Sequence, residues 1–192
     1  MAAAERLFAQ RGYAGTSIHA LAKAARVSKA SVFHHFRSKE ALYLEVISAA
    51  AREFREQLDA MPRGNAVSRE HIEAFVVRQL EHMLRRSRVT RLVLREVTEG
   101  GAHQSRRLTK GGLGVNFTLL VELLRGAQAA GMVHPNVDCT VAACLLTGAN
   151  IFFFQALPLL THLPAIGFKD DAGAYARQVT HQILNGILVR RK

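Results

Sequence analysis

Residues 16–37 read TSIHALAKAARVSKASVFHHFR, and this stretch decides the fold prediction. Two short apolar faces at the helical period lie on either side of residues 25–27. The first face carries Leu21 and Ala22, and the second carries Val32. Because Ala22 is small, the two helices can cross closely. The stretch therefore predicts a short helix, a tight turn and a second short helix.

Hydroxyl residues precede both predicted helices. Thr16 or Ser17 stands before the first helix and Ser28 before the second, and such side chains accept hydrogen bonds from the free N–H groups of a first helical turn. The turn is Ala25-Arg26-Val27, and we expect Val27 to fill the gap between the helices. This pattern is a helix-turn-helix, in which the second helix lies in the major groove of DNA.

Outward side chains of the second helix are candidates for DNA contact. Lys29 can donate to guanine or phosphate, and Ser31 to a base or a phosphate. Ser38 is expected to cap a further helix with Lys39 in its first turn, where N–H groups, the helix dipole and a cation can meet one phosphate. The predicted DNA-binding residues are Thr16, Ser17, Ser28, Lys29, Ala30, Ser31, Phe33, His34, His35, Arg37 and Lys39.

The rest of the chain also follows the helical period, so we predict an all-α fold of about nine helices. No stretch alternates as a strand does. Glycines at 111, 112 and 114 interrupt one helix, and since an interior glycine costs about 1 kcal/mol relative to alanine, a kink or a late start is expected there. The longer helices are expected at 39–60, 69–86, 88–99, 105–130, 137–157 and 171–190.

The charge is strongly basic. The 192 residues carry 26 Lys and Arg against 15 Asp and Glu, a net charge of +11, which favours nucleic acid or an anionic membrane as partner. Residues 1–40 hold seven basic against two acidic side chains, and residues 85–112 hold eight against two. With 49% hydrophobic residues the chain has enough apolar material for a core, which excludes disorder.

Residues 139–168 contain no Asp, Glu, Lys or Arg, and about 20 apolar residues suffice to span a membrane. Gly148, Asn150 and Pro158 interrupt this stretch, and its flanks are amphipathic, so we expect a buried or interface helix rather than a span. The two cysteines form no paired motif, which favours a reducing, cytoplasmic setting.

Candidate catalytic and metal sites are weak. Adjacent helical residues such as His34 and His35 point about 100° apart, and His134 stands near Cys139 and Cys144 without a compact ligand spacing. The sequence lacks the HExxH, GxSxG and GxxxxGK[ST] motifs. We therefore predict no enzyme activity, no metal and no cofactor.

Residues 2–47 resemble the DNA-binding domain of TetR-type transcriptional regulators. The resemblance lies in Leu7-Phe8, Arg11-Gly12-Tyr13, Thr16-Ser17-Ile18, Leu21-Ala22, Ala25-Arg26-Val27-Ser28-Lys29, His35-Phe36 and Ser38-Lys39-Glu40-Ala41-Leu42. It implies a homodimer on a near-palindromic operator, with residues 1–47 binding DNA and residues 48–192 binding a small effector and dimerising.

Two positions depart from the family pattern. Arg26 stands where the family usually has glycine at positive φ, a conformation that should cost arginine about 1 kcal/mol. Phe33 stands where the family usually has a tyrosine whose hydroxyl touches phosphate, so that contact is lost here.

The effector is expected to be a hydrophobic or amphipathic small molecule. Arg91 and Arg95 are either a solvated helix end or a pair that turns one side chain inward to a carboxylate, and Phe152 to Phe154 divide among cavity, interface and core. The predicted pocket residues are Arg91, Leu92, Arg95, Phe117, Leu120, Asn150, Phe153, Phe154 and Gln155. The predicted dimer interface comprises Ala142, Ala143, Ala149, Val179, Ile183 and Ile187.

Two other classes of function stay open at this point. An all-helical binding protein or enzyme without a DNA role would show no salt-dependent affinity for DNA. A membrane-associated helical protein would not stay in solution without detergent.

Overall fold

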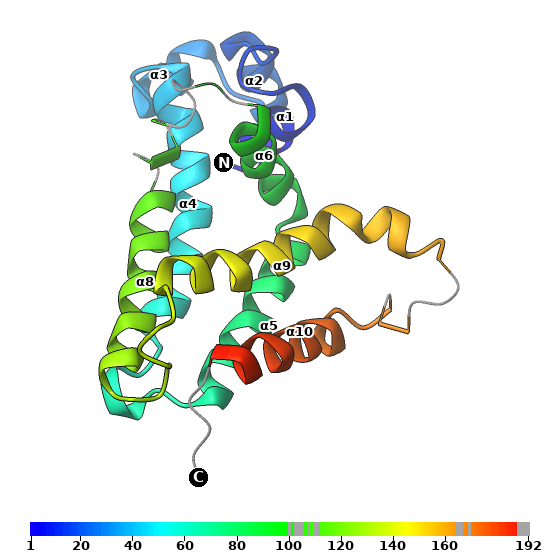
Figure 1. The fold of residues 1–192 in the computed structure, drawn as a ribbon. Helices are drawn as coiled ribbons and strands as arrows, with labels where there is room; N and C mark the ends of the chain where they lie inside the picture. Colours follow the sequence, from blue (N-terminus) through cyan, green and yellow to red (C-terminus); the bar gives the residue numbers. More distant parts are fainter. Residues whose placement is uncertain are drawn as a thin grey trace. The chain divides into compact units, whose positions relative to one another are not determined.

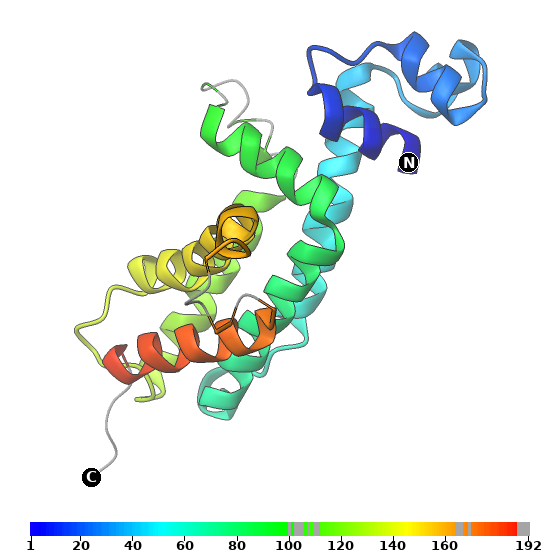
Figure 2. The same cartoon turned by 90° about the vertical axis from the view of Figure 1, so that its right-hand side faces the viewer.

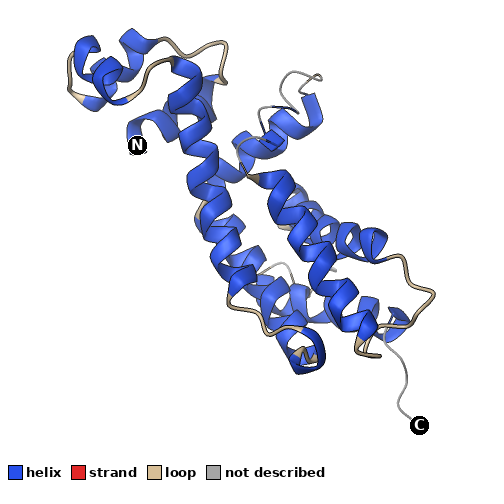
Figure 3. Ribbon diagram, turned by 90° about the vertical axis from the view of Figure 1, so that its left-hand side faces the viewer, coloured by secondary structure: helices blue, strands red, loops and turns tan. Residues whose placement is uncertain are grey.

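The computed structural model describes residues 1–99, 101, 106, 108–109, 112–163, 167–168 and 170–187. Within these residues it contains nine α-helices, one short 3-10 helix at Gly64–Ala66 and no strand, which confirms the all-α prediction (Figures 1 and 3). The α-helices are α1 (Ala2–Arg11), α2 (Ile18–Ala25), α3 (Lys29–His35), α4 (Lys39–Asp59), α5 (Arg69–Arg85), α6 (Ser87–Glu99), α8 (Leu113–Ala129), α9 (Cys139–Leu160) and α10 (Ala172–Ile187).

The chain packs as two compact units. Unit 1 comprises Met1–Glu53 and Arg86–Val115, and unit 2 comprises Phe54–Arg85 and Asn116–Lys192. The predicted functional boundary between residues 47 and 48 falls inside α4, which is continuous from Lys39 to Asp59. Packing thus assigns α6 to unit 1, whereas the sequence division into 1–47 and 48–192 stays a prediction about function.

Unit 1 is built on aromatic and aliphatic side chains from α1, α2, α3, α4 and α6. Phe8 and Tyr43 are fully buried, and their rings meet edge to face with centroids 5.1 Å apart. From α6, Val89 and Leu92 are buried in the same cluster. Figure 2 shows α1, α2 and α3 as short helices grouped around the beginning of α4.

Unit 2 has a separate core formed by α5, α8, α9, α10 and the end of α4. Its largest fully buried side chains include Phe75, Leu124, Leu146 and Phe153. Helices α9 and α10 both pack against α5, and they also pack against each other.

The break predicted near the glycines precedes α8. This helix begins at Leu113, directly after Gly112 at a φ of 95°, so the expected late start is confirmed. Gly111 lies outside the described residues.

Among the helices searched in the described part of the chain, only α9 is long and apolar enough to cross a membrane. This is weak evidence for a span, because a core helix of a soluble protein passes the same test. Ala143, Leu146 and Phe153 of α9 are buried in the core of unit 2.

Candidate DNA interface and effector site

Serine side chains begin the three helices of the predicted DNA-binding motif. Ser17 accepts from the N–H of Ala20 at 3.1 Å at the start of α2, and Ser28 accepts from the N–H of Ser31 at 3.0 Å at the start of α3. Ser38 accepts from the N–H of Ala41 at 3.0 Å at the start of α4. The predicted caps are confirmed, and Ser17 rather than Thr16 caps α2.

Thr16 has an internal role instead. Its side chain is buried, and its hydroxyl donates to the carbonyl oxygens of Gly12 at 2.7 Å and Leu7 at 3.3 Å. It therefore satisfies free carbonyls at the end of α1. The side chain is not part of the exposed surface to which the sequence assigned it.

Arg26 adopts the left-handed backbone conformation that we expected at this position, where the family usually has glycine. Its φ is 57° and its ψ is 43°, and its N–H donates to the carbonyls of Ala22 and Lys23. The side chain is exposed. The backbone of the turn thus ends α2 with the geometry usually reserved for glycine.

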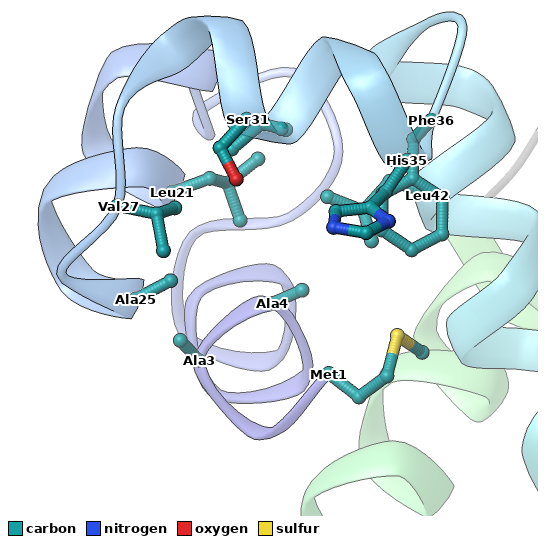
Figure 4. A pocket seen from close by; sticks show the side chains of 11 residues that line it. Met1, Ala3, Ala4, Leu21, Ala25, Val27, Ser31, His35, Phe36 and Leu42 are labelled. Atoms are coloured by element: carbon teal, nitrogen blue, oxygen red, sulfur yellow. The ribbon is translucent and has the colours of Figure 1, made fainter.

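The prediction that Val27 fills the gap between the helices is wrong. Its side chain is 45% exposed. A cavity of about 180 Å³ lies between α1 and α3 instead (Figure 4). Alanine side chains at positions 3, 4 and 25 line it and leave it unfilled, and Ser31 and His35 point into it from α3.

The outer side of α3 is accessible as predicted. Phe33 is 50% exposed, Ser31 is half-buried, and Val32 is the buried residue of the helix. Arg37, just beyond the end of α3, is also exposed. The exposed candidates on α3 are Lys29, Ala30, Phe33, His34 and His35.

Lys39 is held in place at the start of α4. Its ammonium donates to the carbonyl of Tyr13 at 2.9 Å and lies 4.2 Å from the centroid of the Tyr13 ring. An ammonium has three donors, so this hydrogen bond leaves two for a phosphate. The contact with Tyr13 also fixes the direction of the side chain.

Three predicted effector residues belong to unit 1. Leu92 is fully buried in the unit 1 core, and Arg91 is exposed. Arg95 donates to the carbonyl of Phe8 at 3.1 Å and so caps the end of α1. Arg95 therefore stabilises the end of α1, and a contact of its other N–H groups with a carboxylate effector stays a prediction. Arg86 adds an ion pair to Glu5 of α1 at 3.4 Å.

Unit 2 contains a set of buried polar side chains within its apolar core. They come from four helices: Gln79 and His82 from α5, Asn116 from α8, Asn150 from α9 and Thr180 from α10. Asn150 has no exposed surface, and its Nδ2 donates to the carbonyl of Val76 at 2.8 Å and to Oε1 of Gln79 at 2.9 Å. Apolar walls with a few polar groups are typical of ligand pockets.

The other predicted pocket residues divide between this core and the surface. Leu120, Phe153 and Phe154 are buried, and Phe117 packs against the core while half-buried. Gln155 is exposed. Gln79 is not among the residues predicted from the sequence, although its place on the apolar face of α5, beside Val76 and Met83, is a detectable signal.

The predicted dimer residues do not share one exposed face. Ala142 and Ala143 are buried in the core of unit 2, and Ala149 is half-buried, with its carbonyl accepting from the Tyr175 hydroxyl at 2.8 Å. Val179 and Ile183 are half-buried against the same core. The side chain of Ile187 lies outside the described residues.

Four large apolar side chains are instead exposed on one side of α9. Val141, Leu145, Phe152 and Leu159 are 51% to 62% exposed, at spacings of four and seven residues. These spacings place them in a row along the helix. We call this row the α9 stripe.

Hydrogen bonding and burial near the start of α9 shift the pKa values of Asp138 and Cys139. Backbone N–H groups of Val141 and Thr140 lower the pKa of Asp138, which caps the helix. Burial raises the pKa of the Cys139 thiol, whereas Cys144 is exposed. Within the described ranges, His, Cys, Asp and Glu nowhere gather in threes as a metal site requires.

The three capped helices form a helix-turn-helix motif, which is typical of DNA-binding regulators. A family model described as bacterial regulatory proteins, tetR family, matches residues 1–46. This match and the relatives below support a TetR-type transcriptional regulator.

Individual relatives agree with this assignment. The chain is 26% identical over 159 residues to the HTH-type transcriptional repressor NemR of Escherichia coli, covering 79% of this chain and 80% of the relative. It resembles the fatty acid degradation regulator FadR from Bacillus halodurans, with a TM-score of 0.73, 17% identity and coverage of 100% and 94%. It also resembles the flavonoid-responsive regulator FrrA, with a TM-score of 0.65, 25% identity and coverage of 99% and 95%. These relatives are regulators rather than enzymes.

Proposed function

We propose that this regulator is a cytoplasmic homodimeric repressor that binds a near-palindromic operator with α3 of each copy. A small effector bound in unit 2 releases it from DNA. The observation that carries the proposal is the exposed outer side of α3, with Lys29, Phe33 and His34 accessible on a helix whose inner residue, Val32, is buried.

The proposed DNA contacts follow from this exposure. Lys29 stands in the first turn of α3, the part of a recognition helix that meets base edges. Phe33 has no hydroxyl for phosphate, but its ring can contact a thymine methyl group. Arg37 and Lys39 follow at the junction of α3 and α4, where Ser38 caps the first turn of α4.

The experiment is a salt titration of operator binding. An operator is selected from a random duplex pool, and the affinity is measured from 50 to 200 mM salt. Each phosphate contact adds about 0.9 to the slope of log affinity against log salt, so Arg37→Ala should lower the slope by about 0.9. Arg125→Ala, an exposed cation of unit 2, is the control and should leave it unchanged. An equal slope in both variants would remove Arg37 from the interface, and absence of any DNA binding would favour a binding protein without a DNA role.

We propose that the α9 stripe is the dimer surface in place of the buried alanines. Contiguous exposed apolar side chains of this size mark association sites, and a two-fold dimer places the same patch on both copies. Phe152→Glu should give a monomer with unchanged helix content and weaker operator binding. Gln178→Glu, at an exposed position of α10, should stay dimeric. Sedimentation of wild type as a monomer at micromolar concentration would overturn this part.

The effector site is proposed to lie among the buried polar residues of unit 2. Asn150 and Gln79 supply the polar groups, and Phe153 and Phe154 supply apolar surface. The response of FrrA to flavonoids supports an amphipathic ligand. An effector that weakens operator binding tenfold must itself bind tenfold more weakly to the DNA complex, a coupling of about 1.4 kcal/mol.

A further inference from the structure

The orientation of the Asn150 amide is fixed by its partners. The carbonyl of Val76 can only accept, and it lies 2.8 Å from Nδ2, so this atom must be the donor end of the amide. Oε1 of Gln79 also accepts from Nδ2, at 2.9 Å. A rotated amide would direct oxygen at oxygen in both contacts. Both N–H groups of Asn150 are therefore used.

The other end of the same amide has no partner. Oδ1 of Asn150 is buried and receives no hydrogen bond from any described residue. Two hydroxyls of α10 in unit 2 already have acceptors, since Tyr175 donates to the carbonyl of Ala149 and Thr180 to that of Ala176. Buried acceptors without a donor are rare and call for a specific explanation.

We propose that the effector donates a hydrogen bond to Oδ1 of Asn150, and that it is therefore an uncharged amphipathic molecule with a hydroxyl or N–H group. This inference rests on the proposed function, because it places the ligand in unit 2. An effector donor satisfies the one end of the amide that the protein leaves open. The two protein contacts hold that oxygen in a fixed position for the ligand.

The same geometry disfavours an anionic ligand. A carboxylate only accepts hydrogen bonds, so it would place its negative charge against the Oδ1 acceptor. Rotation of the amide to present its N–H groups would break the contacts to Val76 and Gln79. The buried acceptor thus selects a phenol or alcohol over a carboxylate of the same carbon skeleton.

The test compares three ligands of nearly equal shape on the wild-type protein. They are 2-naphthol, its methyl ether and 2-naphthoate, measured by equilibrium dialysis without DNA at pH 7.5, where naphthoate is anionic. A net hydrogen bond contributes about 0.5–1.5 kcal/mol, or about a 2- to 12-fold change in affinity. We expect 2-naphthol to bind at least threefold more tightly than the ether and tenfold more tightly than the carboxylate.

Two variants show whether the preference for 2-naphthol over its methyl ether depends on Asn150. Asn150→Leu should abolish the advantage of 2-naphthol over its ether, whereas Gln155→Leu, at an exposed position of the same helix, should preserve it. If Asn150→Leu fails to fold, the three-ligand comparison on wild type still decides. Equal binding of naphthol and ether, stronger binding of naphthoate, or binding of none of the three would overturn the proposal.

Failure of the proposed function has a different signature. If the protein prefers 2-naphthol in dialysis but shows no salt-dependent DNA binding, the result supports the ligand site and contradicts the function as a regulator. If the protein binds operator but prefers naphthoate, the result supports the function as a regulator and contradicts the requirement for a hydrogen-bond donor on the ligand.

Discussion

Replacing Arg26 with glycine should stabilise the protein. Arg26 holds a φ of 57° and a ψ of 43°, a left-handed conformation that costs an L-residue about 1–2 kcal/mol. Glycine adopts it without that cost but loses more backbone entropy on folding, about 0.5–1 kcal/mol. The difference lies between about 0 and 1.5 kcal/mol, with a central value of about 0.75 kcal/mol in favour of Arg26→Gly.

A matched variant separates the backbone from the side chain. Arg26→Ala keeps the left-handed cost and removes the guanidinium, which is exposed. An exposed substitution of this kind changes stability by less than about 0.5 kcal/mol. We therefore expect Arg26→Gly to be more stable than both wild type and Arg26→Ala.

Thermal and urea unfolding give the measurement. For a chain of this size 1 kcal/mol corresponds to about 2–4 °C in Tm, so Arg26→Gly should raise the Tm by about 1–4 °C at constant urea m-value. A glycine variant no more stable than the alanine variant would refute the argument from backbone strain. The salt slope of DNA binding provides a second reading, because an equal fall in both variants would show that the guanidinium contacts phosphate.

Three further predictions concern the start of α9. The lowered pKa of Asp138 means that its cap stabilises the protein above the ordinary value of 3.8 and loses this effect as pH falls through the lower folded value; Asp138→Asn should make urea midpoints less dependent on pH there, and an unchanged dependence would contradict this. Gln128→Leu should cost about 1–3 kcal/mol in urea unfolding, because the two N–H groups of its Nε2 are shared among three carbonyls within 3.2 Å, those of residues 134, 135 and 137; a neutral effect would contradict it. Iodoacetamide should modify Cys144 in the native protein and Cys139 only after unfolding, since burial raises the pKa of Cys139; two equally fast modifications would show otherwise.

Local features of the motif could be predicted because their causes lie within a few residues. A serine cap needs only an N–H three positions ahead, so Ser28 and Ser38 cap their helices as expected. The left-handed conformation of Arg26 was expected from the resemblance to a family that usually has glycine there, and not from the arginine or its neighbours. Thr16 is the exception, because the carbonyls that it satisfies belong to α1.

Assignments that depend on which elements meet could not be made from periodicity. The apolar face of α6 carries Val89 and Leu92. The helical period predicts that this face is buried, but it does not show which other helices the face packs against. The partner is the unit 1 core, with Arg95 bonded to Phe8. A pocket prediction that joined Leu92 to Phe153 therefore mixed residues of two units.

In helix α9 almost all residues are apolar, so the sequence does not show which side of the helix faces the core. Nearly every position is apolar, so composition does not distinguish the side of Ala142, which is buried, from that of Val141, which is exposed. Asn150 supplies the missing direction, since a buried amide must find partners, and those partners are Val76 and Gln79 of α5. Once Asn150 faces α5, the larger side chains of the α9 stripe are turned outward. The burial of Asn150 against α5, on which the proposed ligand contact depends, thus also leaves exposed the apolar side chains of the proposed dimer surface.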